Sequence, residues 1–284
     1  HIDICLIILY NFFMSKKIKI TATAFLVLSV AAFIVIFFVP ITYSADKVCD
    51  KLWRDTLPRV ALSVAIYSLA VICDMRGFFK VNIKDAPRLI LWCVPAMLVV
   101  IANFPFSALI SGTANIERAD LIWLFLLKCL FIAISEEVIF RGVLLWLVRD
   151  MYKNRRHSFL ITVLLSSAIF ALFHLLNLAE GAGIGPTLLQ VGYTFLTGLM
   201  FACTAERTES LWAPIALHFA FDVGGLMITD LGSGTFQDTI FWVLTAVCAA
   251  ICAVHLILYA ISRDRADRQN YEKIAAEKQT SDKE

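Results

Sequence analysis

Two adjacent glutamates and an arginine lie inside the apolar stretch ISEEVIFRGVLL, residues 134–145. Glu137 and Arg141 are four residues apart with the acid on the N-terminal side, which is the favourable order for an ion pair within one helix. Glu136 lies about 100° around the helix from Glu137, so the same arginine does not neutralise it. The pattern predicts one paired carboxylate and one carboxylate, that of Glu136, that is free to react.

Two other apolar stretches supply possible partners for Glu136. FALFH places Phe170 one turn before His174, and HFAFD places His218 one turn before Asp222. A carboxylate can take a proton from water, and imidazoles can donate hydrogen bonds to a developing oxyanion. If the three stretches converge, Glu136, His174, His218 and Asp222 have the chemistry for hydrolysis by an activated water molecule.

The elements that must position these residues are transmembrane helices. Of the 284 residues, 60% are hydrophobic and only 17% are charged, and several apolar runs exceed the roughly 18 residues that mark a membrane span. We therefore expect an all-α fold, a polytopic bundle of transmembrane helices. Eight spans are predicted, at about 20–43, 57–74, 88–110, 119–148, 158–178, 187–204, 211–229 and 239–261.

The lysines and arginines of the short loops predict the orientation of the bundle. They gather before the first span, around the loop at 76–88, in the loop at 149–157 and after the eighth span. The loops of the other side carry few. We therefore expect an integral membrane protein with both termini in the cytoplasm.

The chain divides into three unequal parts. Residues 1–13 precede Met14 and are expected to be an upstream extension of the true start, 14–262 form the membrane domain, and 263–284 form a charged cytoplasmic tail. The net charge of +2 gives no sign of nucleic-acid binding. The eight cysteines lack the paired spacings of a disulfide framework or a zinc ribbon, so we interpret them as packing residues.

Ionisable residues at membrane depth need partners or a function, because each costs about 2.5–3.5 kcal/mol near a helix centre. A single transmembrane histidine is more often a helix-to-helix hydrogen bonder than a catalyst, but two histidines beside a double glutamate favour catalysis. Lys128, near the outer edge of its span, is expected to extend its ammonium group to the membrane surface. Phe170 and the Gly198–Ala202 spacing are expected to serve packing.

EEVIFRG, FALFH and HFAFD, in that order on three spans, resemble the motifs EExxxR, FxxxH and Hxxx(N/D). These are the motifs of the CAAX protease and bacteriocin-processing family of intramembrane proteases, also called Abi, which includes the type II CAAX prenyl endopeptidases. The resemblance covers about 120–230. The family contains endoproteases that remove the last three residues of prenylated CAAX proteins, and bacterial members linked to bacteriocin maturation or self-immunity.

The resemblance implies a role for each motif residue. Glu136 would be the general base that activates water, with His174 assisting, and the pair of Glu137 and Arg141 would hold the helix in place. His218 and Asp222 would support the oxyanion or the water. The prenyl endopeptidases commonly have asparagine where this chain has Asp222, and an ionised carboxylate cannot donate a hydrogen bond to an oxyanion.

These observations predict an endopeptidase of the bacterial cell membrane that cleaves membrane-associated substrates, either prenylated or bacteriocin-like, in the bilayer. We expect no cofactor and no nucleic-acid partner, and the oligomeric state is not predicted. Three alternatives stay open: a zinc-dependent protease with His174, His218 and Glu136 as ligands, a non-catalytic bacteriocin-immunity protein, and a proton-coupled transporter. We disfavour the transporter because no chain of polar residues is seen to reach the outer face.

Overall fold

The computed structural model describes residues 41–72, Phe79, 86–179 and 181–281, with scattered positions between 20 and 39. The expected extension at 1–13 lies outside the described residues, and the expected first span at 20–43 lies partly outside them.

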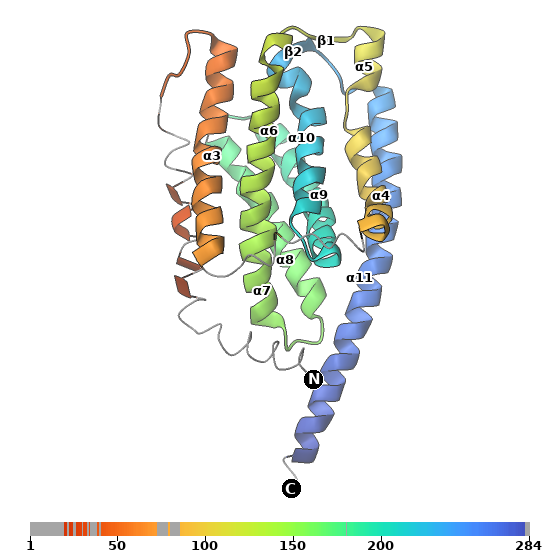
Figure 1. Ribbon diagram of the computed structural model, residues 1–284. Coiled ribbons are helices and arrows are strands. Elements are labelled where there is room, and N and C mark those ends of the chain that lie inside the picture. Colours follow the sequence, from red (N-terminus) through yellow and green to blue (C-terminus); the bar gives the residue numbers. More distant parts are fainter. Residues whose placement is uncertain are drawn as a thin grey trace.

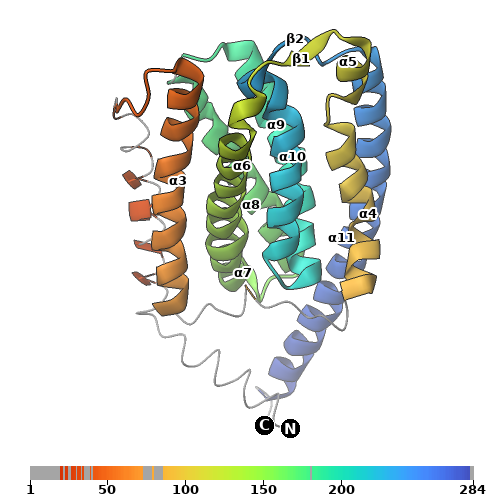
Figure 2. The same ribbon diagram turned by 45° about the horizontal axis from the view of Figure 1, so that its top comes forward.

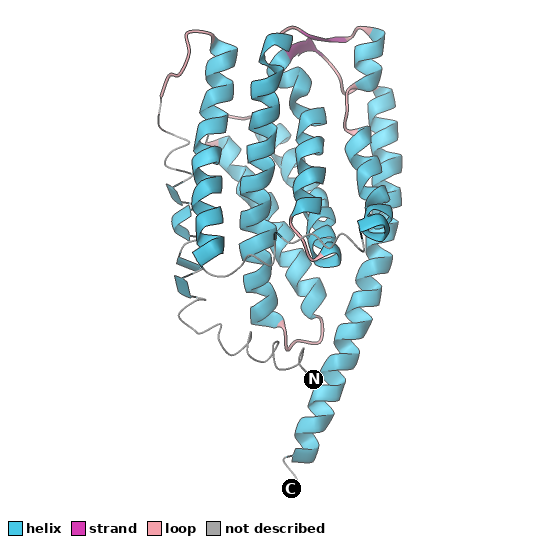
Figure 3. Ribbon diagram, viewed as in Figure 1, coloured by secondary structure: helices cyan, strands magenta, loops and turns pink. Residues whose placement is uncertain are grey.

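The described chain is almost entirely helical (Figure 3). In chain order the elements are α3 (Lys47–Ile72), α4 (Ala86–Ala102), α5 (Phe106–Ser111), β1 (Ala114–Ile116), η3 (Ala119–Leu121), α6 (Ile122–Glu137), η4 (Val138–Leu144), α7 (Leu145–Tyr152), α8 (Ser158–Phe173), η5 (His174–Leu178), α9 (Ile184–Thr208), α10 (Trp212–Leu231), β2 (Gly232–Gly234) and α11 (Thr239–Ser281).

Within the part of the chain that the structure describes, five helical segments are long and apolar enough to cross a membrane, which supports an integral membrane protein built as an all-α bundle. The expected count of eight spans is not confirmed. The fourth expected span is divided among α6, η4 and α7. The five segments are Ala86–Ser111, Ser158–Leu178, Ile184–Thr208, Trp212–Leu231 and Thr239–Glu277.

The long helices lie roughly parallel, with α6 between α3 and α10 (Figures 1 and 2). α8 packs along α9, and α11 packs along α4. Buried apolar side chains fill the interior between these helices, among them Phe125 under α3 and Phe201 between α9 and α10. This arrangement brings the three motif helices, α6, α8 and α10, into one bundle.

The two ends of the bundle differ in composition. At one end, which we call the hairpin end after its pair of strands, β1 pairs antiparallel with β2, and Ala114 lies opposite Gly234. At the opposite end, the tail end, the α7–α8 turn lies beside the C-terminal part of α11 (Figure 1). The basic loop at 149–157 and the charged tail therefore share one end of the molecule, as the loop charges predict.

The charged tail continues α11 and docks on the α7–α8 turn. Nδ1 of His157 lies 2.7 Å from Oδ1 of Asp264, and the backbone N–H of Phe159 donates to Oδ2 of Asp267 at 2.6 Å. Asp264 is buried by these contacts. The first turns of the tail are therefore packed against the bundle.

At the hairpin end, Asp46 and Arg118 join the start of α3 to the segment before α6. Oδ1 of Asp46 accepts the backbone N–H of Cys49 at 2.8 Å, and Arg118 Nη1 donates to Asp46 Oδ2 at 2.8 Å. These two contacts, the backbone one first, hold the pKa of Asp46 below its usual range.

The expectation that Lys128 extends to the membrane surface is wrong. Its ammonium lies 2.7 Å from Oδ2 of Asp55 on α3 and 2.8 Å from Oδ2 of Asp230 on α10, and the residue is 5% exposed. Lys51 lies 2.8 Å from the other oxygen of Asp230 and reaches solvent. We call these four residues the charged clamp, because they tie α3, α6 and α10 together.

The charged clamp also corrects one argument made from the sequence. A chain of ionised side chains does run inward from the hairpin end, from Lys51 through Asp230 and Lys128 to Asp55. The absence of such a chain therefore no longer counts against a transporter.

Candidate active site

Glu137 is the centre of a buried polar cluster. Its Oε1 accepts Arg141 Nη1 at 2.9 Å and lies 2.7 Å from Nδ1 of His218 on α10. The side chains of Glu137 and Arg141 are completely buried and that of His218 nearly so. Because one carboxylate oxygen serves both partners, Glu137 joins the first motif to the third and is committed to structure.

Arg141 is enclosed by the aromatic rings of two neighbouring helices. Its guanidinium carbon lies 4.1 Å from the centre of the Phe170 ring and 5.5 Å from that of Phe201. These cation–π contacts compensate part of the cost of burying the charge. The second motif therefore supports the first through Phe170, in addition to the packing role expected for that ring.

Gly198 allows α9 to approach this cluster closely. Arg141 Nη2 donates to the carbonyl oxygen of Gly198 at 3.4 Å. A Cβ atom at this position would lie 3.2 Å from Cβ of Ser167 and 3.3 Å from Cδ1 of Phe170. The small residue at this point agrees with the close helix packing expected from the sequence.

The helix that carries Glu136 and Glu137 changes to a π-helical turn immediately after them. In η4 the backbone N–H of Leu145 reaches back five residues to the carbonyl of Phe140, and Ser166 Oγ on α8 donates to the same carbonyl at 3.0 Å. Such turns insert one residue into a helix and occur often at functional sites. Here the turn holds Arg141 on the face that meets α8 and α9.

Glu136 points to the other side of His218. Its Oε2 lies 3.8 Å from Nε2 of His218, and Oδ2 of Asp222 lies 3.5 Å from the same nitrogen. The side chain of Glu136 is 18% exposed, whereas that of Glu137 is fully buried. The two adjacent glutamates therefore flank one imidazole, and Glu136 is the more accessible of them.

The imidazole of His218 is fixed in orientation. Phe201 stacks on it with ring centres 5.0 Å apart and an angle of 19° between the planes. Since Nδ1 faces the carboxylate of Glu137, this nitrogen carries a proton and donates. Nε2 is left to face Glu136 and Asp222.

His174 begins η5, where α8 tightens into a 3-10 turn. Its Nδ1 lies 3.0 Å from the carbonyl oxygen of Phe170. Because a carbonyl only accepts, Nδ1 is the donor, and Nε2 of a neutral ring has a free lone pair. The Phe170 ring contacts both imidazoles, with centres 5.0 Å from His174 and 6.2 Å from His218. The second and third motifs are therefore neighbours.

Among the residues that the structure describes, no three or more His, Cys, Asp or Glu side chains are arranged to hold a metal ion. The zinc alternative named His174, His218 and Glu136 as ligands, and these three do not form such a group. We derive no catalytic step through a metal.

Two supporting residues were missed by the sequence analysis. Phe201 orients His218 by stacking, and Ser166 donates a hydrogen bond to the carbonyl of Phe140 in the π turn. Ser166 lies one turn before Phe170 on the same face of α8, which is the signal that could have suggested a role for it.

Comparison with known families identifies the part of the chain that holds this site. Residues 118–224 match the family model of the type II CAAX prenyl endopeptidase Rce1-like proteins. This segment is therefore similar to the Rce1-like family. It contains all three motifs, from Glu136 to Asp222, and confirms the resemblance seen in the sequence. No curated protein and no solved structure matches the chain.

The matched family is that of type II CAAX prenyl endopeptidases, so the match supports a peptidase in general. The matched residues run from the segment before α6 into α10. They therefore include the buried cluster around Glu137 and also the accessible carboxylate of Glu136.

Proposed function

We propose that the protein is an intramembrane endopeptidase in which Glu136 activates the hydrolytic water. The observation that supports this assignment is the contrast between the two adjacent glutamates. Glu137 is fully buried and bound by both Arg141 and His218, whereas Glu136 is partly accessible and faces Nε2 of His218. Only Glu136 has a carboxylate free to take a proton.

The proposed reaction begins with a water molecule between Glu136 and the substrate carbonyl. Glu136 removes one proton, the oxygen of the water forms a bond to the carbonyl carbon, and the carbonyl oxygen becomes an oxyanion. In this step His218 is the imidazolium, with Nδ1–H donating to Glu137 and Nε2–H donating to the oxyanion. His174 helps to orient the water through the lone pair of its Nε2. Glu136 then passes its proton to the leaving nitrogen as the C–N bond breaks.

Asp222 is proposed to hold His218 in place, because its carboxylate lies 3.5 Å from Nε2. Asp222→Asn introduces the residue that the prenyl endopeptidases commonly have, and we expect turnover to stay within about tenfold of wild type. Asp222→Leu removes both the charge and the hydrogen-bonding groups, and we expect a loss of about 10²-fold or more, as for removal of one oxyanion contact. Equal activity of all three proteins would remove Asp222 from the mechanism.

The substrate is proposed to be a membrane-associated peptide or protein, prenylated or bacteriocin-like, that reaches the site from the bilayer. We place both termini in the cytoplasm of a bacterial cell, following the positive-inside rule. A metal-free reaction is proposed over the zinc alternative because the described donors do not form a metal-binding group. The family match favours a peptidase over a transporter.

The direct test is peptide cleavage by the purified full chain in phospholipid vesicles. We expect a farnesylated peptide that ends in a CAAX sequence to be cut at one bond, with both products identified by mass spectrometry. A bacteriocin-like precursor is the second substrate. If neither is cut at any protein concentration, while the protein is folded in the vesicles, the endopeptidase assignment is wrong for these substrate classes.

A further inference from the structure

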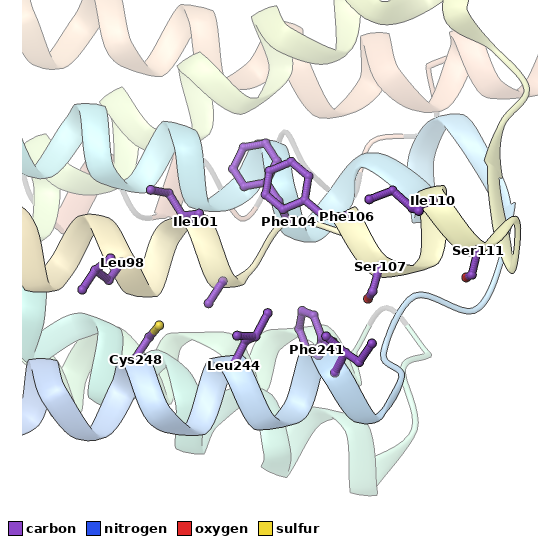
Figure 4. Close-up of a pocket in the computed structure, with 12 residues that line it drawn as sticks. Leu98, Ile101, Phe104, Phe106, Ser107, Ile110, Ser111, Phe241, Leu244 and Cys248 are labelled. Carbon is purple, nitrogen blue, oxygen red and sulfur yellow. The ribbon is translucent and has the colours of Figure 1, made fainter.

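An apolar groove of about 530 Å³ lies between α4–α5 and α11. Figure 4 shows Leu98 and Ser107 from one side, and Phe241, Leu244 and Cys248 from α11, pointing into the space between the two segments. The volume is in the usual range for a site that binds a small molecule. The groove is lined mainly by Leu98, Ile101 and Phe104 on one side and by Phe241, Leu244 and Cys248 on the other.

The groove faces the hydrocarbon of the bilayer. Both of its walls belong to segments long and apolar enough to span the membrane, Ala86–Ser111 and Thr239–Glu277. Its rim is continuous with the apolar outer surface, since Ile110 is 86% exposed and Ile240 58% exposed. An apolar hollow does not hold water well, so the medium available to fill this one is hydrocarbon.

One end of the groove is polar, and the carboxylate of Asp238 lies next to it. Ser107 and Ser111 lie at the hairpin end, and Ser107 hydrogen-bonds to the carboxylate of Asp238, which immediately precedes α11. None of the described lining residues is charged. The carboxylate of Asp238 attracts a positive group, and no lysine or arginine lines the groove to bind a negative one. A lipid headgroup that carries an amine is therefore favoured over an anionic headgroup.

The inner wall of the groove contacts α10 next to the active site. Phe104 packs on Gly224, where a Cβ atom would come within 2.8 Å of its ring, and Asn103 Nδ2 donates to the carbonyl oxygen of Phe221 at 2.8 Å. Phe221 precedes Asp222. A molecule in the groove would therefore contact Phe104, the side chain that packs on α10 at Gly224.

From this geometry we propose that the groove binds one hydrocarbon chain of a bilayer phospholipid with a zwitterionic, amine-bearing headgroup at its Ser107 end. The site is separate from the catalytic cluster, because Phe104 and α10 stand between them. The expected occupant is a structural lipid of the membrane, not the substrate.

The test is photolabelling of the full chain in vesicles of phosphatidylethanolamine and phosphatidylglycerol. A trace of phosphatidylethanolamine with a diazirine near the end of one chain is activated by light, and labelled peptides are identified by mass spectrometry. We expect the groove residues Leu98 and Cys248 to carry about tenfold more label than Leu258, which faces lipid on α11 outside the groove. Equal labelling along α11 would overturn the proposal.

Two matched variants make the result specific. Leu244→Trp fills the groove and should remove the label from Leu98, whereas Ile251→Trp, on α11 outside the groove, should leave it unchanged. If Leu244→Trp does not fold, the labelling pattern of the wild-type protein still decides the question.

Equal labelling by a phosphatidylglycerol probe would contradict the headgroup assignment. Displacement of the label by a farnesylated peptide would mean that the groove holds a prenyl chain, against our proposal. None of these outcomes depends on peptidase activity.

Discussion

Glu136→Gln is expected to lower the turnover number for peptide hydrolysis by about 10²–10⁴-fold, the usual contribution of a general base. The amide has the size of the carboxylate but cannot take a proton from water. Glu136 takes part in no ion pair with Arg141, so the fold should be kept. Activity is measured on vesicle-reconstituted protein, and folding is followed by thermal unfolding in detergent.

The matched control is Glu272→Gln, which changes an exposed glutamate in the tail, 3.5 Å from Arg156. It should leave both activity and unfolding temperature near those of wild type. If Glu136→Gln retains full activity, another group activates the water and our assignment of the base fails. If it unfolds at a much lower temperature, Glu136 has a structural role that the geometry does not indicate.

Lys128→Met should reduce the free energy of unfolding by about 3–5 kcal/mol, the cost of leaving a buried ion unpaired. Two carboxylates, of Asp55 and Asp230, would lose their shared ammonium group in the interior of the bundle. Chemical unfolding in detergent measures the change. Lys47→Met, at the exposed start of α3, is the matched control and should change stability by less than about 0.5 kcal/mol.

A second variant separates charge from packing. Adding Asp55→Asn and Asp230→Asn to Lys128→Met removes all three charges that meet at Lys128, and most of the lost stability should return. If Lys128→Met behaves like Lys47→Met, the ammonium of Lys128 reaches water and the charged clamp does not exist in the membrane.

The polar cluster of the candidate site was largely predictable, because short-range spacing determines it. Glu137 and Arg141 are one turn apart, so any helix brings them together, and the same holds for His218 and Asp222. The sequence pattern also predicts that Glu136 points away from Arg141, as observed. The contact between Glu137 and His218 joins two helices 81 residues apart, and spacing within one helix does not predict it.

The charged clamp was missed because the start of α3 was placed too late. A span that begins at 57 leaves Lys51 and Asp55 in the preceding loop, but the helix begins at Lys47. Asp55 therefore lies within α3 and faces Lys128, whose ammonium finds a carboxylate inside the bundle. A lysine near the end of a span extends to the surface only where no such partner is closer.

The β1–β2 pair and the π turn depend on contacts that no local pattern records. The strands are three residues each, are separated by more than a hundred residues, and form where two connections meet at the hairpin end. The π turn leaves the carbonyl of Phe140 available to Ser166 on α8. Both features are consequences of tertiary packing, which a single sequence does not reveal.

The central claim is that Glu136 activates water without a bound metal, and one combined measurement tests it most directly. The metal content of purified, active protein is determined, and hydrolysis of the farnesylated peptide is then followed before and after extensive treatment with EDTA. We predict far less than one equivalent of zinc per chain and an unchanged rate of hydrolysis. Stoichiometric zinc, whose removal abolishes hydrolysis and whose return restores it, would contradict the claim.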